Sequence, residues 1–402
     1  MTILFPEGFF WGAALSSYQS EGGNINTDWA HWEKEHALEK AAAACDHYNR
    51  FKEDFNLARS MHLNSLRLSF EWARVNPEPD VFSSESLQHY NQVVDELLNF
   101  KLKPFLTLHH FTNPDWFMKK GGWLNPANID FFISYVRNIA QALKGKVEYW
   151  IVFNEPLVYI YHGYITGIWP PGIRNFGQAK KAMDNILKAY AYSYQEIKQT
   201  SSREFQPLVS IAKHIRFFSP CTQGSGLLNC FSSFLRDKYF NINLIEHLKK
   251  RKILDYLAIN YYCKEYVQFK GIFGRECSHD FHPERRNNVG WYVSPEGFYD
   301  TLIRLKRYRL PIFVSENGTA ESQEYLYKEY LEAHLQSLAR ACSKGVDLRG
   351  YFWWSLFDNF EWEKGYGPRF GLYEVDYKDF RRYPRPYSSF YADVCKYNKI
   401  EV

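Results

Sequence analysis

The sequence lacks an excess of charge of either sign. Lys and Arg number 49 and Asp and Glu number 45, which leaves a formal net charge of +4 over 402 residues. This balance excludes a protein that binds nucleic acid mainly through its overall charge, but it is compatible with a local basic patch. Apolar residues make up 46% and charged residues 23% of the chain, a composition typical of a folded globular protein rather than a disordered one.

Long apolar segments and paired cysteine motifs are missing as well. No apolar run approaches the ~18 residues that a membrane span needs, and the first residues, MTILFPEGFFWGAA, have no basic segment before an apolar stretch. We therefore expect no membrane anchor and no signal peptide. The seven cysteines are odd in number, irregularly spaced and without C-x-x-C, so we expect no disulfide framework. These absences predict a reducing, cytoplasmic location.

Aromatic residues are abundant. The chain has 12 Trp, 30 Tyr and 32 Phe, together 18% of its residues. Two interpretations stay open at this point. The rings can fill a large aromatic core, or they can line a cleft that stacks flat ligands such as sugars or bases.

Short apolar runs recur along the chain, and each ends in polar residues. Their continuous hydrophobicity is typical of strands buried on both faces, as in a parallel sheet. Roughly 40 to 60 residues separate successive centres, which leaves room for a helix and two loops. The eight runs are Phe9–Ala14, Ser65–Phe70, Pro104–His110, Tyr149–Glu155, Leu208–His214, Tyr256–Tyr262, Pro311–Glu316 and Tyr351–Asp358.

Helical patterns alternate with these runs. Apolar residues at three- and four-residue spacing predict helices around 48–61, 298–305 and 331–342, and Ser294 with Pro295 is a typical helix start. Eight strands alternating with helices predict an α/β fold of the (β/α)8 barrel type. No linker or composition shift divides residues 1–402, so we expect one barrel domain.

Barrel enzymes carry their active sites at the carboxyl ends of the strands. Two glutamates stand out there, because each comes at the end of a buried apolar run. They are Glu155 in YWIVFNEP and Glu316 in PIFVSENG. The other strand-end candidates are Gln19, Glu21, Arg67, Glu71, His109, His110, Asn154, His214, Asn260, Tyr262, Asn317, Trp354, Asp358 and Glu361. Two carboxyl groups facing across a pocket suit glycoside hydrolysis, in which one protonates the leaving oxygen and the other acts across the bond.

Several longer motifs make the resemblance specific. The chain resembles the retaining β-glycosidases of glycoside hydrolase family 1 almost from end to end. The matching segments, in family order, are FPEGFFWGAALSSYQSEG (5–22), ACDHYNRFKED (44–54), LRLSFEWARVNP (66–77), TLHHFTNP (107–114), FNEP (153–156), LDYLAINYY (254–262), VSPEGFYD (293–300), VSENG (314–318) and WSLFDNFEWEKGYGPRFGLYEVDY (354–377).

The resemblance implies a role for each site residue. Glu155 is expected to be the general acid/base and Glu316 the nucleophile. Arg67 and Tyr262 are expected to hold Glu316 ionised, with Asn260 supporting that end of the pocket and Glu155 holding the proton. The residues expected to bind the sugar are Gln19, His110, Asn154, Tyr262, Trp354, Glu361, Trp362 and Phe370. A retaining mechanism further predicts a carboxyl separation of ~5–5.5 Å.

Some assignments are weaker or depart from the family pattern. Trp169 and Trp291 are expected at the entrance, where the leaving group sits. Phe111 stands where many relatives have Trp, so an indole N–H that could meet a sugar hydroxyl is missing. Glu361 argues against a 6-phosphoglycosidase, because a carboxylate facing O4 and O6 repels a phosphate. His109 and Tyr261 alternate to the opposite face and are expected to pack in the core.

The mechanism requires no metal and no cofactor, and the expected ligand is a small β-glycoside or oligosaccharide. The spacing Cys277-x-His279-x-x-His282 could hold zinc, but the set is isolated and lacks a clear fourth ligand, so we expect no metal there. Two alternatives stay open. In the first, the enzyme mainly transfers sugars to acceptors other than water. In the second, the barrel is a non-catalytic glycan-binding protein, which is disfavoured because both glutamates are present.

Overall fold

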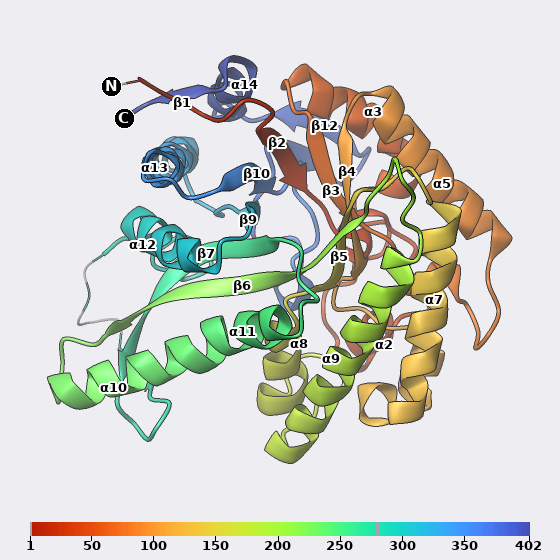
Figure 1. The fold of residues 1–402 in the computed structure, drawn as a ribbon, viewed down its shortest axis with the longest axis horizontal. Coiled ribbons are helices and arrows are strands. Elements are labelled where there is room, and N and C mark those ends of the chain that lie inside the picture. The colour runs from red at the N-terminus through yellow and green to blue at the C-terminus, as the bar shows by residue number, and fades with distance from the viewer. Residues whose placement is uncertain (1, 279–281, 283) are drawn as a thin grey trace.

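Eight parallel strands close into a barrel in the computed structural model, which describes residues 2–278, 282 and 284–402 (Figure 1). Each strand pairs with the next, and the circle closes because β10 pairs with β2 and β6 with β7. The predicted (β/α)8 barrel is confirmed. Its strands are β2 (Phe10–Ala14), β3 (Ser65–Ser69), β4 (Lys103–His109), β5 (Tyr149–Asn154), β6 (Leu208–Pro220), β7 (Leu257–Gln268), β9 (Ile312–Asn317) and β10 (Leu348–Trp354).

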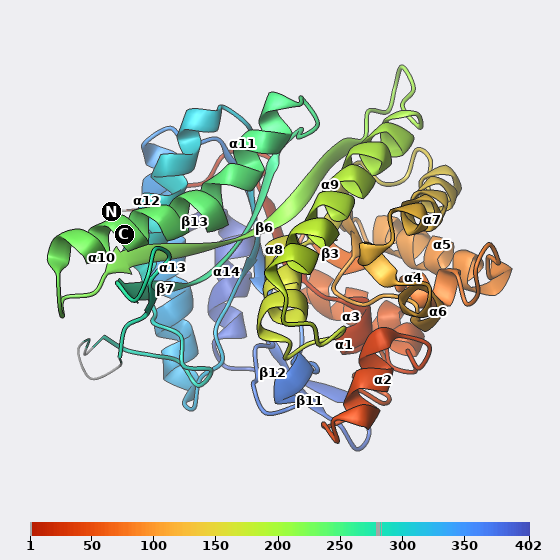
Figure 2. The ribbon, with the colours of Figure 1, turned by 90° about the horizontal axis from the view of Figure 1, so that it is seen from below.

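Helices surround the barrel, as both ribbon views show (Figures 1 and 2). Ser294 caps α12 by accepting from the Gly297 amide, and Pro295 opens that helix, as predicted. The longer helices are α3 (His47–Ser60), α5 (Ser84–Asn99), α7 (Ile129–Ala142), α9 (Phe176–Lys198), α10 (Gly226–Arg236), α12 (Pro295–Leu305), α13 (Glu324–Ser343) and α14 (Ser388–Tyr397).

Shorter elements complete the chain. The short helices are α1 (Ser17–Ser20), α2 (Asp28–Glu35), α4 (Trp72–Val75), α6 (Asp115–Lys119), α8 (Pro156–Ile160) and α11 (Asn243–Lys250). The remaining strands are β1 (Thr2–Leu4), β8 (Arg275–Glu276), β11 (Tyr373–Asp376), β12 (Arg381–Pro384) and β13 (Lys399–Glu401). Pairing of β1 with β13 brings the two chain ends together (Figure 1). Among the described residues, no helix is both long and apolar enough to cross a membrane.

Aromatic rings fill the barrel interior. The Phe105 ring stacks on Tyr149 with 4.3 Å between ring centroids and meets Phe352 edge-on at 4.7 Å. Tyr256 and Phe313 complete this buried layer. The barrel therefore has a packed floor, and part of the high aromatic content belongs to the core. The open cleft lies above this floor, at the carboxyl ends of the strands.

Two strands are longer than the sequence predicts, and one ends earlier. The ladder of β6 and β7 continues to the pair Pro220↔Val267, whereas β10 stops at Trp354 instead of reaching Asp358. The ends of β6 and β7, together with β8 and α10, form what we call the side extension (Figures 1 and 2). The outer residues of β6, Arg216 to Ser219, are only half-buried, so they lack the continuous burial that marks the barrel part of the strand.

The side extension contains a disulfide that the sequence analysis did not anticipate. Cys221 and Cys277 are bonded across 56 residues of chain. Both follow strands that pair with β7, and strand pairing, rather than any sequence spacing, brings them together. Of the zinc-like spacing noted above, Cys277 and His282 are described, while His279 lies outside the described residues.

The hairpin of β11 and β12 is fixed to the barrel by a buried ion pair. Arg382 Nε donates to Asp54 Oδ1 over 2.8 Å, and the side chains are 1% and 0% exposed. His47 Nδ1 lies 2.7 Å from the same carboxylate, and Arg382 also donates to the Cys45 carbonyl oxygen. The hairpin follows the segment that contains Glu361 and Trp362, so this pair stabilises one wall of the cleft.

We predict that Arg382→Ala lowers the free energy of unfolding by about 3–5 kcal/mol, because it removes the guanidinium from the buried Asp54 carboxylate and leaves His47 as its partner. Urea and thermal unfolding followed by circular dichroism measure the change. Arg381→Ala is the matched control, since the Arg381 side chain is 71% exposed and pairs with the exposed Asp379. Equal unfolding midpoints for the two variants would show that the buried pair contributes nothing.

Candidate active site

One cleft collects the strand-end residues. The cavity above the barrel floor has a volume of about 270 Å³, close to the lower end of the range for small-ligand pockets. All ten predicted catalytic and sugar-binding residues line it: Gln19, His110, Asn154, Glu155, Tyr262, Glu316, Trp354, Glu361, Trp362 and Phe370. Trp169, Trp291 and Phe111 line it too, whereas Arg67 and Asn260 lie beneath the surface and contact the lining residues.

Glu316 stands at the end of β9 and is 3% exposed. The β7–β9 register places Asn260 beside it. Arg67 on β3 donates from Nη1 to Glu316 Oε1, and the Tyr262 hydroxyl donates to Glu316 Oε2. Both oxygens therefore accept hydrogen bonds, one from β3 across the barrel and one from the neighbouring β7, which fixes the direction in which the carboxyl group faces the cleft.

Glu155 follows β5 and is 7% exposed. Its Oε1 accepts from Asn260 Nδ2 at 2.7 Å and lies 3.1 Å from His214 Nδ1. Arg216 Nε donates to His214 Nε2 at 3.1 Å, so the His214 proton belongs on Nδ1, where it is donated to Glu155. The tautomer of His214 is thus set by Arg216 on one side and Glu155 on the other.

Asn154 links the two glutamates. Its Oδ1 accepts from Arg67 Nη2 at 2.7 Å and from Asn260 Nδ2 at 3.1 Å. Its Nδ2 lies 3.1 Å from His110 Nε2. Burial and the nearby Arg67 hold the pKa of His110 well below its usual range, so the ring is neutral. With Nε2 accepting from Asn154, the His110 proton sits on Nδ1, a buried atom that has no hydrogen-bond partner among the described residues.

The wall around Glu361 is aromatic and acidic. Gln19 Nε2 donates to Glu361 Oε2 at 3.2 Å and to the Phe360 carbonyl oxygen at 2.8 Å. Burial, with the neighbouring carboxylates Glu363 and Glu316, raises the pKa of Glu361 to about 8. The rings of Trp354, Trp362 and Phe370 lie beside it. Apolar ring faces next to hydrogen-bonding groups suit a ligand such as a sugar, which has an apolar face and a polar edge.

Three lining residues have a left-handed backbone although none is glycine. Their φ angles are 72° for Phe111, 42° for Glu155 and 50° for Trp362. Such conformations cost of order 1–3 kcal/mol each and persist only where the surrounding structure enforces them, which is common at functional sites. At Glu155 this turn directs the chain from β5 into α8, whose first residue is Pro156.

The two carboxyl groups titrate as a pair. Burial raises the pKa of Glu316 to about 7, although Arg67 and Tyr262 both lower it. Burial also raises the pKa of Glu155, but His214, Asn260 and Lys213 together hold it below its usual value. Near neutral pH the pair therefore shares one proton, and the assignment of that proton to Glu155 stays a prediction. Glu155 has donors of its own, which sequence spacing did not reveal.

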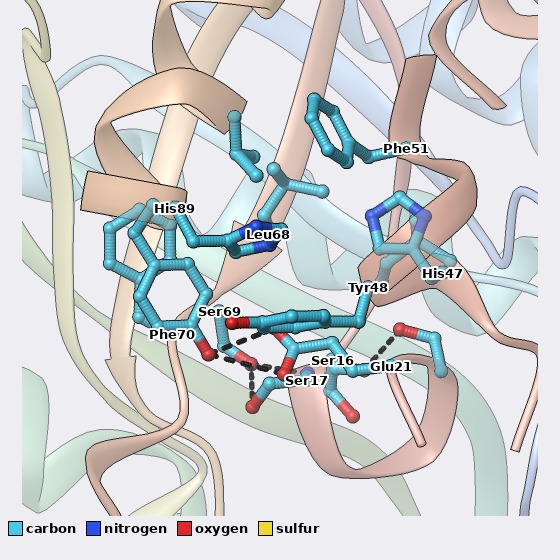
Figure 3. Close-up of a pocket in the computed structure, with 14 residues that line it drawn as sticks. Ser16, Ser17, Glu21, His47, Tyr48, Phe51, Leu68, Ser69, Phe70 and His89 are labelled. Carbon is cyan, nitrogen blue, oxygen red and sulfur yellow. Dashed lines mark hydrogen bonds between the residues drawn. The ribbon is translucent and has the colours of Figure 1, made fainter. Parts of the chain in front are cut away.

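Two strand-end glutamates point away from the cleft. Glu21 accepts from Arg74 at 3.0 Å and from Tyr90, and Glu71 accepts from Thr112 at 3.0 Å. Figure 3 shows Glu21 beside a separate small pocket that Tyr48 and His89 also line. The rings of Tyr48 and His89 stack with 3.7 Å between their centroids. Both glutamates therefore stabilise the loops behind the cleft.

Other strand-end candidates also lie in the interior. Asp358 pairs with Arg385 at 2.8 Å and with Arg369. His109 packs against Phe153 and reaches Asn113 at 3.1 Å. The Tyr261 hydroxyl donates to the Ser294 carbonyl oxygen. The packing expected for His109 and Tyr261 is confirmed.

Several cleft residues had no role in the sequence analysis. His214 was placed at a strand end without a partner, and Arg216 was not considered. Lys213 is 2% exposed, and burial lowers its pKa to about 7. His162, Glu363 and Lys364 complete this group of polar lining residues. The only sequence signal for them was a cluster of basic residues at the end of one apolar run.

Comparison with known proteins gives one consistent result. The sequence profile of glycosyl hydrolase family 1 matches residues 1–226 and 234–400. β-Glucosidase A of Thermotoga maritima is 31% identical, over 99% of this chain and 99% of its own length. A β-galactosidase of Pyrococcus woesei is 28% identical, over 99% and 98%. The solved structure of a β-glycosidase from Pyrococcus horikoshii superposes with a TM-score of 0.93 at 34% identity, over 100% of this chain and 97% of that one.

Proposed function

The chain belongs to glycosyl hydrolase family 1, and from that premise we propose that it is a retaining, exo-acting β-glycosidase. It is an O-glycoside hydrolase of the β-glucosidase and β-galactosidase family. The substrates that we propose are small glycosides or oligosaccharides with β-linked glucose, galactose or fucose at the non-reducing end. We further propose that residues 1–402 act as one catalytic domain in the cytoplasm.

One observation carries this proposal. Glu155 and Glu316 end two buried strands of one barrel, and each has its own set of donors within a single aromatic cleft. A retaining enzyme needs two carboxyl groups with different tasks. The predicted separation of ~5–5.5 Å between them stays a prediction.

The proposed reaction has two displacements. Glu316 attacks the anomeric carbon and forms a covalent glycosyl-enzyme, while Glu155 gives its proton to the departing glycosidic oxygen. Glu155 then takes a proton from water, and the water oxygen releases the sugar with its original β configuration. The Tyr262 hydroxyl and Arg67 guanidinium orient the attacking oxygens of Glu316, and Asn154 together with the Nδ1–H of His110 meets sugar hydroxyls.

The shared proton has to be on Glu155 for the first displacement. Attack requires Glu316 as a carboxylate and Glu155 as an acid. Arg67 and Tyr262 favour the ionised form of Glu316, and a glycosidic oxygen beside Glu155 supplies an acceptor for its O–H. We propose that the bound substrate holds the shared proton on Glu155.

The roles of the two glutamates predict opposite azide products. Glu155→Ala should slow substrates with poor leaving groups by about 10²–10⁴-fold, spare those with very acidic leaving groups, and give a β-glycosyl azide when azide is added. Glu316→Gly should give the α-azide, because azide enters from the vacated face. Product configuration is measured by NMR, with Glu148→Ala, at the opposite end of β5, as a control that should retain full activity. A β-azide from Glu316→Gly would reverse the assignment.

The shared proton predicts a bell-shaped pH profile. The active pair holds one proton, so kcat/KM should fall about tenfold per unit above about pH 7, the pKa of Glu316, as the last proton leaves. The value of kcat/KM should fall again at low pH, when the pair takes up a second proton and both carboxyl groups are neutral.

His214 sets the alkaline side of this profile. His214→Phe removes a hydrogen-bond donor that favours the ionised form of Glu155. The two glutamates should therefore keep their shared proton to higher pH. The ratio of kcat/KM at pH 8 to kcat/KM at pH 6 should rise several-fold. His214→Asn can retain an N–H donor and should shift the profile less. Identical profiles for both variants and the wild type would contradict the role of His214.

The Glu361 wall predicts the sugar preference. Phe111 offers no hydrogen bond, and losing one neutral hydrogen bond costs about 0.5–1.5 kcal/mol, roughly tenfold in binding. Aryl β-glucoside, β-galactoside and β-fucoside should therefore differ little in kcat/KM, and a thousandfold preference for one of them would contradict this. A 6-phospho-β-glucoside should be a poor substrate, and poorest above about pH 8, the pKa of Glu361, because ionised Glu361 and Glu363 then face the phosphate against one lysine, Lys364. Glu361→Gln should improve its turnover, and efficient turnover by the wild type would refute the charge argument.

A further inference from the structure

A second cluster of reactive side chains lies outside the cleft, in the side extension. The sulfurs of Cys221 and Cys277 and a ring nitrogen of His282 all lie within 4.8 Å of one another. The three residues are 3%, 2% and 6% exposed. Cys221 follows β6 and Cys277 follows β8, so three segments of chain converge at this point.

The two histidine nitrogens have different surroundings. Nε2 of His282 is buried and has no hydrogen-bond partner among the described residues. Nδ1 lies 4.0 Å from Glu284 Oε2. The ring stacks on Tyr266 with 3.4 Å between centroids and 6° between planes, and the Tyr266 hydroxyl contacts the same glutamate. A disulfide alone gives no reason for an imidazole held in this way with one nitrogen left unpaired.

We propose that Cys221, Cys277 and His282 form a zinc site in the reduced protein. Two thiolates and one imidazole are a ligand set that zinc accepts, with Zn–S near 2.3 Å, Zn–N near 2.0–2.1 Å and a water in the fourth position. Metal-binding histidines usually direct their second nitrogen to a carboxylate, and Glu284 occupies that place. This inference concerns a separate site and does not depend on the proposed glycosidase activity.

Zinc binding and the disulfide exclude each other. The structure has the two sulfurs bonded, and opening the bond takes two electrons and two protons from a thiol reductant such as a cellular dithiol, which becomes a disulfide itself. Each thiol loses its proton when it binds zinc, so two protons leave for each ion bound. In a reducing compartment the thiol form, and hence the zinc form, is the one expected.

The side extension has reason to need such a cross-link. Among the described residues, its local apolar cluster has four buried members: Cys221, Tyr266, Cys277 and Tyr292. β8 has two residues and pairs with β7 at Val267↔Glu276 and Gln268↔Arg275. A zinc ion would join the ends of β6 and β8 to His282, where this described cluster is small.

The test measures zinc directly. The full chain is reduced with a phosphine, freed of metal with a chelator, incubated with Zn²⁺ and passed through gel filtration, and bound zinc is counted by plasma mass spectrometry. We expect about one zinc per chain and a higher melting temperature with zinc than with chelator, as for any ligand that binds only the folded state. Bound Co²⁺ should show an intense thiolate charge-transfer band.

Matched variants identify the ligands. Cys221→Ser and His282→Ala should each lose the zinc, and Cys221→Ser should weaken the cobalt band. Glu284→Gln should bind zinc about 10–100-fold more weakly, the usual effect of removing a carboxylate behind a metal-bound histidine. Cys230→Ser is the control, because Cys230 is an exposed thiol on α10, and it should bind as the wild type does.

Two results would overturn the proposal. The first is reduced wild type, shown by thiol titration to have both sulfurs free, that retains no zinc after gel filtration. The second is equal zinc in the wild type and in folded Cys221→Ser and His282→Ala. An unchanged far-ultraviolet circular dichroism spectrum and a cooperative thermal transition show that a variant's barrel is folded, so a loss of zinc is then local to the side extension.

Discussion

The candidate site depends on one buried cation, the guanidinium of Arg67. It is 1% exposed and donates to Thr107 on β4, Asn154 on β5 and Glu316 on β9. Four strands therefore meet at one side chain beneath the cleft. Removing one partner of a buried ion pair commonly costs about 3–5 kcal/mol, so the same contact that orients Glu316 also holds the strand ends together. Arginine suits this place because its planar fork reaches several acceptors at once and stays charged when buried.

From Arg67, hydrogen bonds reach every part of the acid/base pair. Asn154 accepts from Arg67 and Asn260, and Asn260 donates onward to Glu155. The two carboxyl groups are thus joined through amides, which cannot titrate near neutral pH. A change of charge on one glutamate is felt by the other through their mutual repulsion, while their positions stay fixed. This separates the geometry of the pair from its protonation, as a reaction needs when the proton moves and the atoms around it must not.

The sequence alone was sufficient for the barrel and for most of the lining residues. Continuous apolar runs marked all eight strands, and parallel strands bring their carboxyl ends to one edge, so Glu155 and Glu316 were expected in one cleft. The contact between His214 and Glu155 was missed. Strand register decides which side chains meet at the ends of neighbouring strands, and the sequence does not reveal the register. The donors around Glu155 were also missed, because burial and strand register decide them. Cys221 joins Cys277 and His282 only through the ladder of β6, β7 and β8, which has no local sequence signal.

The side extension is continuous with the active site. One hydrogen-bonded ladder runs from Ala212↔Ala258 inside the barrel to Pro220↔Val267 outside it, with a register shift between Ile215 and Phe217. Arg216 sits at that shift, where it donates to His214 on the cleft side and to Glu265 at 2.8 Å on the outer side. A residue at an irregularity in the ladder can turn its side chain toward the cleft without breaking the strand. Because Arg216 fixes the tautomer of His214, and His214 donates to Glu155, the outer end of the β6–β7 ladder is two hydrogen bonds from the acid/base carboxyl group. The extension is therefore part of the site's support as well as part of its rim.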